Sequence, residues 1–71
     1  MYANIIVDIS HEQLDKTFQY RIPEAMKEKL TLGMQVYVPF GKRNIKGYVV
    51  GLTDEPEFEV AKIKEIIGIA T

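Results

Sequence analysis

The chain has 71 residues, which is enough for one small domain. Hydrophobic residues make up 46% of it and charged residues 27%, a balance that is typical of globular proteins and excludes a disordered chain. It contains no cysteine, so disulfides and thiolate metal sites are excluded. The net charge of −1 argues, on its own, against binding to nucleic acid.

The charges are unevenly distributed along the sequence. Lys42, Arg43 and Lys46 cluster without an intervening acid, whereas residues 54–59 carry four carboxylates. A domain that is nearly neutral overall can therefore still present one basic edge. An ordinary solvated surface is the alternative interpretation of the same cluster.

The sequence contains no recognisable membrane or secretion signal. Residues 1–9 lack a basic opening region, and no apolar run reaches the length of a membrane span. We therefore expect a cytoplasmic location.

The first half of the sequence predicts two strands and a short helix. In residues 4–10, β-branched residues alternate with polar ones, which is the period of a half-buried strand. Residues 11–16 are polar and predict a loop. Residues 18–22 alternate again, and Pro23 ends this second strand. Because proline suits the first turn of a helix, we expect a short helix that extends to about Leu30.

The second half predicts further strands. Residues 34–40 alternate as a third strand, in which Pro39 marks a strand margin or an edge. Residues 45–52 form a fourth strand. Its internal glycines, Gly47 and Gly51, indicate a bulge, a bend or a close approach of two backbones.

The tail, residues 58–69, fits two structures. Its isoleucines have helical spacing, whereas residues 60–64 fit a strand that carries Lys62 and Lys64 on one face. Taken together, the elements predict a mainly β fold, a small curved sheet or partial β-barrel of about five strands with one short helix.

Motifs for nucleotide hydrolysis and nucleophilic catalysis are absent from the sequence. There is no Gly-x-x-x-x-Gly-Lys-Ser/Thr loop and no Gly-x-Gly-x-x-Gly. The single histidine, His11, is next to Ser10, but adjacency in sequence does not make a catalytic pair, and we expect a surface residue. Asp8, Glu12 and Asp15 are expected to be solvated carboxylates rather than a metal site. We therefore expect that the chain is not itself an enzyme.

Two stretches of the chain carry a recognisable pattern. Residues 5–24 contain Ile-Ile-Val-Asp-Ile-Ser and then Leu-Asp-Lys-Thr-Phe-Gln-Tyr-Arg-Ile-Pro-Glu. Residues 33–52 centre on Val-Tyr-Val-Pro-Phe-Gly-Lys-Arg and continue into Lys-Gly-Tyr-Val-Val-Gly. In order and spacing, both stretches resemble the opening segment of the PriA family of replication-restart helicases, also called primosomal protein N′.

The resemblance implies a DNA-binding role. Residues 1–71 would be a single domain, excised from the N-terminus of a larger ATP-dependent 3′–5′ DNA helicase of the bacterial cytoplasm. It would recognise the 3′ end of the nascent leading strand at a stalled replication fork. ATP and zinc would be bound only by the rest of the parent protein, and no cofactor is expected here. The implied partners are single-stranded or forked DNA with a free 3′ end, the helicase core of the same chain and, through the parent, primosome proteins.

The resemblance also implies a set of site residues. The family's 3′-end pocket maps onto Phe18, Gln19, Gly41 and Lys64, and Lys62 competes with Lys64 for the last position. Phe18 would stack on the terminal base, Gly41 would let the nucleotide approach the backbone, and the lysine would meet the phosphate. A core residue, a plain turn glycine and a solvated lysine are the respective alternatives.

Gln19 departs from the family pattern, in which aspartate is more frequent. A glutamine carbonyl can accept a hydrogen bond from a 3′-hydroxyl, but without the assistance of a charge. We therefore expect a weaker bond at this position. Lys42, Arg43 and Lys46 are expected to hold flanking phosphates, which position DNA without reading its sequence.

Two interpretations without direct DNA binding stay open. One is a protein-interaction module that binds peptides through exposed Tyr37 and Tyr48. The other is a domain that docks onto the helicase core.

Overall fold

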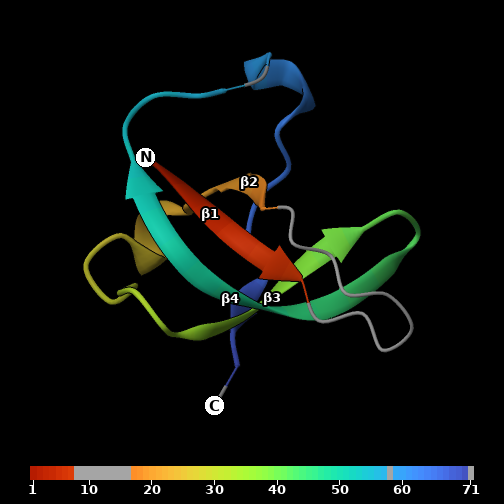
Figure 1. The fold of residues 1–71 in the computed structure, drawn as a ribbon, viewed down its shortest axis with the longest axis horizontal. Helices are drawn as coiled ribbons and strands as arrows, with labels where there is room; N and C mark the ends of the chain where they lie inside the picture. Colours follow the sequence, from red (N-terminus) through yellow and green to blue (C-terminus); the bar gives the residue numbers. More distant parts are fainter. Residues whose placement is uncertain (8–16, 58, 71) are drawn as a thin grey trace.

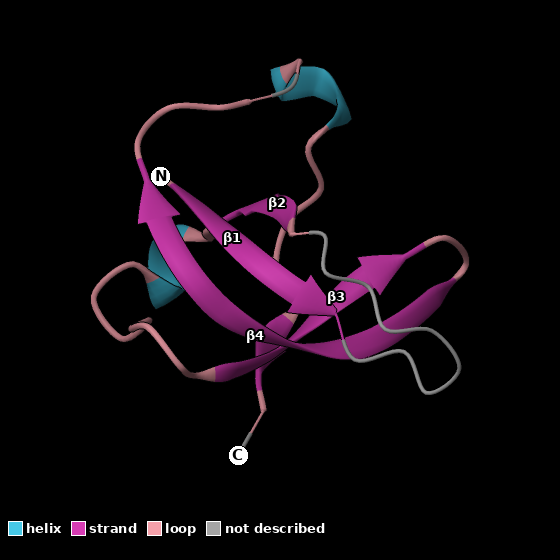
Figure 2. Ribbon diagram, in the orientation of Figure 1, coloured by secondary structure: helices cyan, strands magenta, loops and turns pink. Residues whose placement is uncertain are grey.

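A computed structural model describes residues 1–7, 17–57 and 59–70. Within these ranges the chain forms one five-stranded sheet with the strand order β2-β1-β4-β3-β5 (Figures 1 and 2). The strands are β1 (Tyr2–Val7), β2 (Phe18–Arg21), β3 (Gln35–Phe40), β4 (Arg43–Thr53) and β5 (Gly68–Ile69). All four ladders are antiparallel. The predicted mainly β, curved sheet of about five strands is confirmed.

The first strand begins earlier than the sequence predicts. β1 buries Ala3, Ile5 and Val7, which alternate with half-buried side chains on the outer face. The predicted continuation of this strand and the polar loop after it, residues 8–16, lie outside the described residues. The expectations for Ser10, His11 and the nearby carboxylates therefore stay predictions.

The core lies on the concave side of the sheet. β3 and β4 direct Val36, Val38 and Val49 inward, and these side chains meet Ile5 of β1. The largest fully buried side chains are all β-branched: Ile5, Ile66, Val36, Val38 and Val49. Such residues pack well on a pleated surface, so the alternation that marks the strands also forms the core.

The glycines of β4 allow it to bend closely around β1. At Gly47, an added Cβ would overlap Cγ2 of Ile5 and lie 3.0 Å from the carbonyl oxygen of Ile6. Between Val49 and Gly51 the register against β1 shifts by one residue, which is a bulge. The sequence-based expectation of a bulge and a close backbone approach is confirmed, and Figure 1 shows the resulting curvature of β4.

The short helix expected after Pro23 is a single 3-10 turn, η1 (Glu24–Met26), and it ends before Leu30. Three turn residues follow, and Leu30 N donates a hydrogen bond to Met26 O at 2.9 Å. Only Met26 and Leu30 anchor this segment to the core, and two contacts do not offset the cost of nucleating a longer helix. None of the helices among the described residues has the length and apolar character to cross a membrane.

Neither structure predicted for the tail is correct. The segment begins with a 3-10 turn, η2 (Val60–Lys62), and its strand, β5, comes six residues later. Ile63 and Ile66 are buried, whereas Ile67 is 49% exposed, which an amphipathic helix would not produce. The helical spacing of these isoleucines therefore does not reflect a helix, and this part of the tail is extended.

That extended segment joins the two sides of the curved sheet. Arg21 N of β2 donates to Lys64 O at 2.8 Å, and Ile66 N donates to Arg21 O at 3.0 Å. One residue later, Ile67 N donates to Tyr37 O of β3 at 2.8 Å. The sheet is not closed by a continuous ladder, but these bonds give it the shape of a partial barrel.

Replacing Gly47 by alanine should lower the free energy of unfolding by about 1–3 kcal/mol, because the added methyl group has no room against β1. Gly68→Ala is the matched control, since an added Cβ at Gly68 meets nothing within 4 Å. Urea unfolding followed by circular dichroism measures both. Equal stability of the two variants would show that the close approach of β4 to β1 does not constrain the fold.

Candidate nucleic-acid interface

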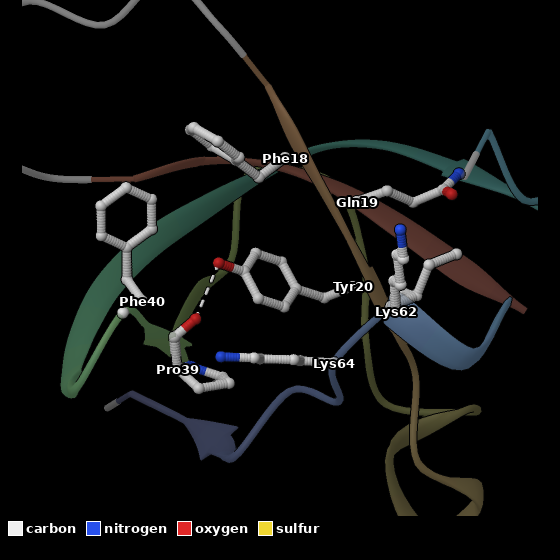
Figure 3. Close-up of a pocket in the computed structure, with 9 residues that line it drawn as sticks. Phe18, Gln19, Tyr20, Pro39, Phe40, Lys62 and Lys64 are labelled. Carbon is white, nitrogen blue, oxygen red and sulfur yellow. Dashed lines mark hydrogen bonds between the residues drawn. The ribbon is translucent and has the colours of Figure 1, made fainter. Parts of the chain in front are cut away.

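A pocket of about 280 Å³ opens between β2, the end of β3 and the tail. Its lining consists of Phe18, Gln19, Tyr20, Pro39, Phe40, Gly41, Lys62, Ile63 and Lys64 (Figure 3). Three segments that are distant in sequence thus meet in one place. The pocket exists because the curvature of the sheet brings β2 near the end of β3, although two other strands separate them in the sheet.

One wall of the pocket is aromatic. The rings of Phe18 and Phe40 pack edge to face, with centroids 5.2 Å apart and an interplanar angle of 81°. Below them the hydroxyl of Tyr20 donates a hydrogen bond to the carbonyl oxygen of Pro39 at 2.9 Å (Figure 3). Phe18 and Phe40 are half-buried, so each contacts the core and presents a surface to the pocket. Phe18 therefore packs against the core and also lines the pocket, and its stacking on a base stays a prediction.

Gln19 is the buried polar side chain of the site. It is only 7% exposed, against the outward orientation that the alternation of its strand predicts. Its Nε2 donates to Glu55 O at 3.1 Å, and its Oε1 accepts from Glu57 N at 2.8 Å. Gln19 thus holds the acidic loop that follows β4. Each of its two polar atoms still has one further hydrogen-bonding position, so its proposed contact with a 3′-hydroxyl stays a prediction.

Both candidate lysines line the pocket. Lys62 is paired with Glu59 at 3.9 Å, and both side chains are about three-quarters exposed (77% and 76%). Lys64 makes no ion pair with the described carboxylates, and Figure 3 shows it extending beneath Tyr20 toward Pro39. Because Ile63 is buried between the two lysines, both of them are directed outward at the rim.

The remaining predicted cations lie beside the pocket, not in it. Gly41 lines the pocket at the start of the β3–β4 turn, and Lys42 and Arg43 follow it directly. Gly41 has a φ of 61°, in the region that favours glycine, and an added Cβ there would meet nothing within 4 Å. Lys46 is farther along β4 and exposed. All three cations are exposed to solvent.

The sequence analysis missed some lining residues. Tyr20, Pro39, Phe40 and Ile63 complete the pocket but were not among the predicted site residues. Pro39 and Phe40 belong to the Val-Pro-Phe-Gly block that carried the resemblance, so their position next to Gly41 was an available signal. Ile63 had no such signal, because its place depends on the path of the tail.

Comparisons with known proteins identify the family of the chain. The family model described as the 3′ DNA-binding domain (3′BD) of PriA matches residues 4–71. The chain belongs to the PriA 3′ DNA-binding domain family. It is also 37% identical, over 65 residues, to the replication restart protein PriA of Bacillus subtilis (strain 168). The match covers 92% of this chain and 8% of that relative.

Membership of the PriA 3′ DNA-binding domain family indicates that this domain binds DNA in replication restart. The pocket brings together an aromatic wall, an exposed glycine and two lysines, which are residue types that can contact DNA. Gln19 anchors the acidic loop through both a donor and an acceptor.

Replacing Gln19 by leucine should lower the free energy of unfolding by about 1–2 kcal/mol, because both hydrogen bonds to the acidic loop are lost. Gln35→Leu is the matched control, since Gln35 makes one exposed hydrogen bond, to Tyr48. Urea denaturation measures both variants. A loss no larger than that of the control would contradict the anchoring role of Gln19.

Replacing Tyr20 by phenylalanine should lower the free energy of unfolding by about 1 kcal/mol at neutral pH, because the bond to Pro39 is lost. Burial raises the pKa of the Tyr20 hydroxyl above its ordinary value of 10.0. The contribution of the neutral hydroxyl is therefore complete below pH 10.0 and is lost as the pH rises through the higher folded-state pKa.

The stability difference between Tyr20→Phe and the unmodified chain should accordingly shrink above pH 10.0. Urea titrations across the alkaline range test this, with Tyr37→Phe as the control for loss of an exposed phenol. A difference that stays constant with pH would show that ionisation of Tyr20 is not linked to unfolding.

Proposed function

We propose that this domain binds the 3′-terminal nucleotide of a DNA strand in the pocket between β2, β3 and the tail. The observation that carries the proposal is that Phe18, Gln19, Gly41 and Lys64, which the resemblance names together, line one pocket. The volume of about 280 Å³ is at the small end of ligand sites, which suits a single nucleotide.

Each part of the pocket has a counterpart in a strand end. The edge-to-face pair of Phe18 and Phe40 offers an apolar surface to a base of any identity. Open space at Gly41 would admit the sugar close to the backbone, and Lys64, at the rim of the pocket, would meet the preceding phosphate. Gln19 supplies the hydrogen-bonding position for the 3′-hydroxyl.

The acidic loop favours a hydroxyl over a phosphate at the strand end. Gln19 holds the backbone of Glu55 and Glu57 next to its own side chain, so the loop that carries these two acidic residues lies on that side. A terminal phosphate would add negative charge there and be repelled. Selectivity for a free 3′-hydroxyl then needs no charged residue at position 19.

The wider role follows from the relative. The chain spans 8% of the Bacillus subtilis protein, so the activities of the whole protein are part of the proposal. We infer that the domain delivers a larger ATP-dependent 3′–5′ helicase to the 3′ end of the nascent leading strand at stalled forks, in the bacterial cytoplasm. Its further partners would be the helicase core of the same chain and primosome proteins.

A docking module without DNA binding is the alternative. Val50 and Leu52 on the outer face of β4 are 46% and 39% exposed, which gives a second protein an apolar surface to cover. The measurement below separates the two functions, because a docking module has no preference among DNA ends.

Oligonucleotides labelled at the 5′ end, with either a 3′-hydroxyl or a 3′-phosphate, test end recognition by fluorescence anisotropy at low salt. The unmodified domain should prefer the 3′-hydroxyl. Gly41→Asn should weaken that binding by about tenfold or more, because asparagine tolerates a positive φ but fills the space beside the backbone. Gly33→Asn is the control, since Gly33 also has a positive φ, of 88°, and is not in the pocket.

Equal affinity for both ends would overturn end recognition. The same assay assigns the lysines: Lys64→Met should reduce the slope of log affinity against log salt by about 0.7, the value for one phosphate contact on a single strand. Lys62→Met should change it less, because Lys62 is already paired with Glu59.

A further inference from the structure

The β3–β4 hairpin concentrates positive charge. Of the nine lysines and arginines in the chain, three lie between Gln35 and Thr53, and none of its ten acidic residues does. Lys42, Arg43 and Lys46 are all exposed. The rest of the chain is therefore net acidic, and the hairpin is the surface that attracts a polyanion.

Two tyrosines stand on the outer face of this hairpin. Tyr37 and Tyr48 are 40% and 41% exposed, because the alternate residues of both strands form the core. Tyr37 lies opposite Lys46, and Tyr48 lies opposite Gln35, whose side-chain amide donates to the Tyr48 hydroxyl at 3.0 Å. The two rings are diagonal neighbours, a spacing of about 7–8 Å that aromatic side chains can bridge.

The outer face of the hairpin that carries Tyr37 and Tyr48 extends toward the pocket. Pro39 lies two residues beyond Tyr37 on the same face of β3, and Pro39 lines the pocket. On its other flank Tyr37 pairs with Gly68 of β5, where an added Cβ would meet nothing within 4 Å. Packing does not require a glycine there, so its missing side chain leaves one side of the Tyr37 ring open.

We propose that single-stranded DNA lies along this outer face, with bases stacked on Tyr37 and Tyr48 and a phosphate at Lys46. The direction of the strand rests on the proposed function: the 3′-terminal nucleotide fills the pocket, and the preceding nucleotides pass over Pro39 to the tyrosines. Any base can stack on an aromatic ring, so this binding surface of Tyr37, Tyr48 and Lys46, called the track below, accepts any DNA sequence. The cations beside the rings favour a nucleic acid over an apolar peptide.

Binding should therefore increase with the length of the strand. The test compares a 5′-labelled dinucleotide, which reaches only the pocket, with a single strand of about eight nucleotides, which reaches the tyrosines. Tyr37→Ala and Tyr48→Ala should each weaken binding of the longer strand by roughly fivefold to a hundredfold. Neither should change binding of the dinucleotide or the preference for a 3′-hydroxyl.

Two further variants sharpen the test. Gly68→Val should weaken binding of the longer strand by closing the open side of the Tyr37 ring, without loss of fold. Tyr2→Ala is the matched control, because Tyr2 lies on the outer face of β1, opposite Thr53 at the far end of β4. It should bind both strands like the unmodified chain. Circular dichroism confirms that each variant is folded.

Changes in the amide chemical shifts on addition of DNA provide a measurement that a purely structural role of the tyrosines would not affect. The longer strand, but not the dinucleotide, should shift the amide signals of Tyr37, Lys46 and Gly68. Unchanged affinity of the folded tyrosine variants for the longer strand would overturn the track while leaving end recognition intact. Length-dependent, tyrosine-dependent binding without a preference for the 3′-hydroxyl would support the track and refute the proposed function. Binding of neither strand would overturn both.

Discussion

The hydrogen bonds that the extended tail makes to two separate strands determine the shape of this domain. Arg21 of β2 exchanges bonds with Lys64 and Ile66, and Tyr37 of β3 accepts one from Ile67. These bonds hold the sheet in its curled form without a continuous ladder. The pocket lies between β2, the end of β3 and the start of the tail, so this connection holds its walls together along with the Tyr20–Pro39 hydrogen bond and the Phe18–Phe40 pair.

The acidic loop gives a physical reason for a glutamine at position 19. The loop presents a carbonyl oxygen at Glu55 and an N–H at Glu57, so its anchor must both donate and accept. A glutamine side chain does both, whereas an ionised aspartate only accepts. The amide also avoids placing another negative charge beside the carboxylates of the loop. In this chain, position 19 therefore joins the site to the stability of its surroundings.

Segregation of charge reconciles a net charge of −1 with DNA binding. The hairpin from Gln35 to Thr53 carries cations alone, and the acids gather elsewhere, above all in residues 54–59. The hairpin contributes Pro39, Phe40 and Gly41 to the pocket, and it also carries the exposed Tyr37 and Tyr48. With few cations we expect the attraction to be weak and sensitive to salt.

The sequence by itself determined the strands and part of the site. Alternation of apolar and polar residues located β2, β3 and β4, because burial of one sheet face imposes a period of two. Only the tertiary structure decided the path of the tail, the burial of Gln19 and the surroundings of Lys62 and Lys64. Those features depend on backbone bonds and packing between segments far apart in the chain, which leave no periodic signal in the local sequence.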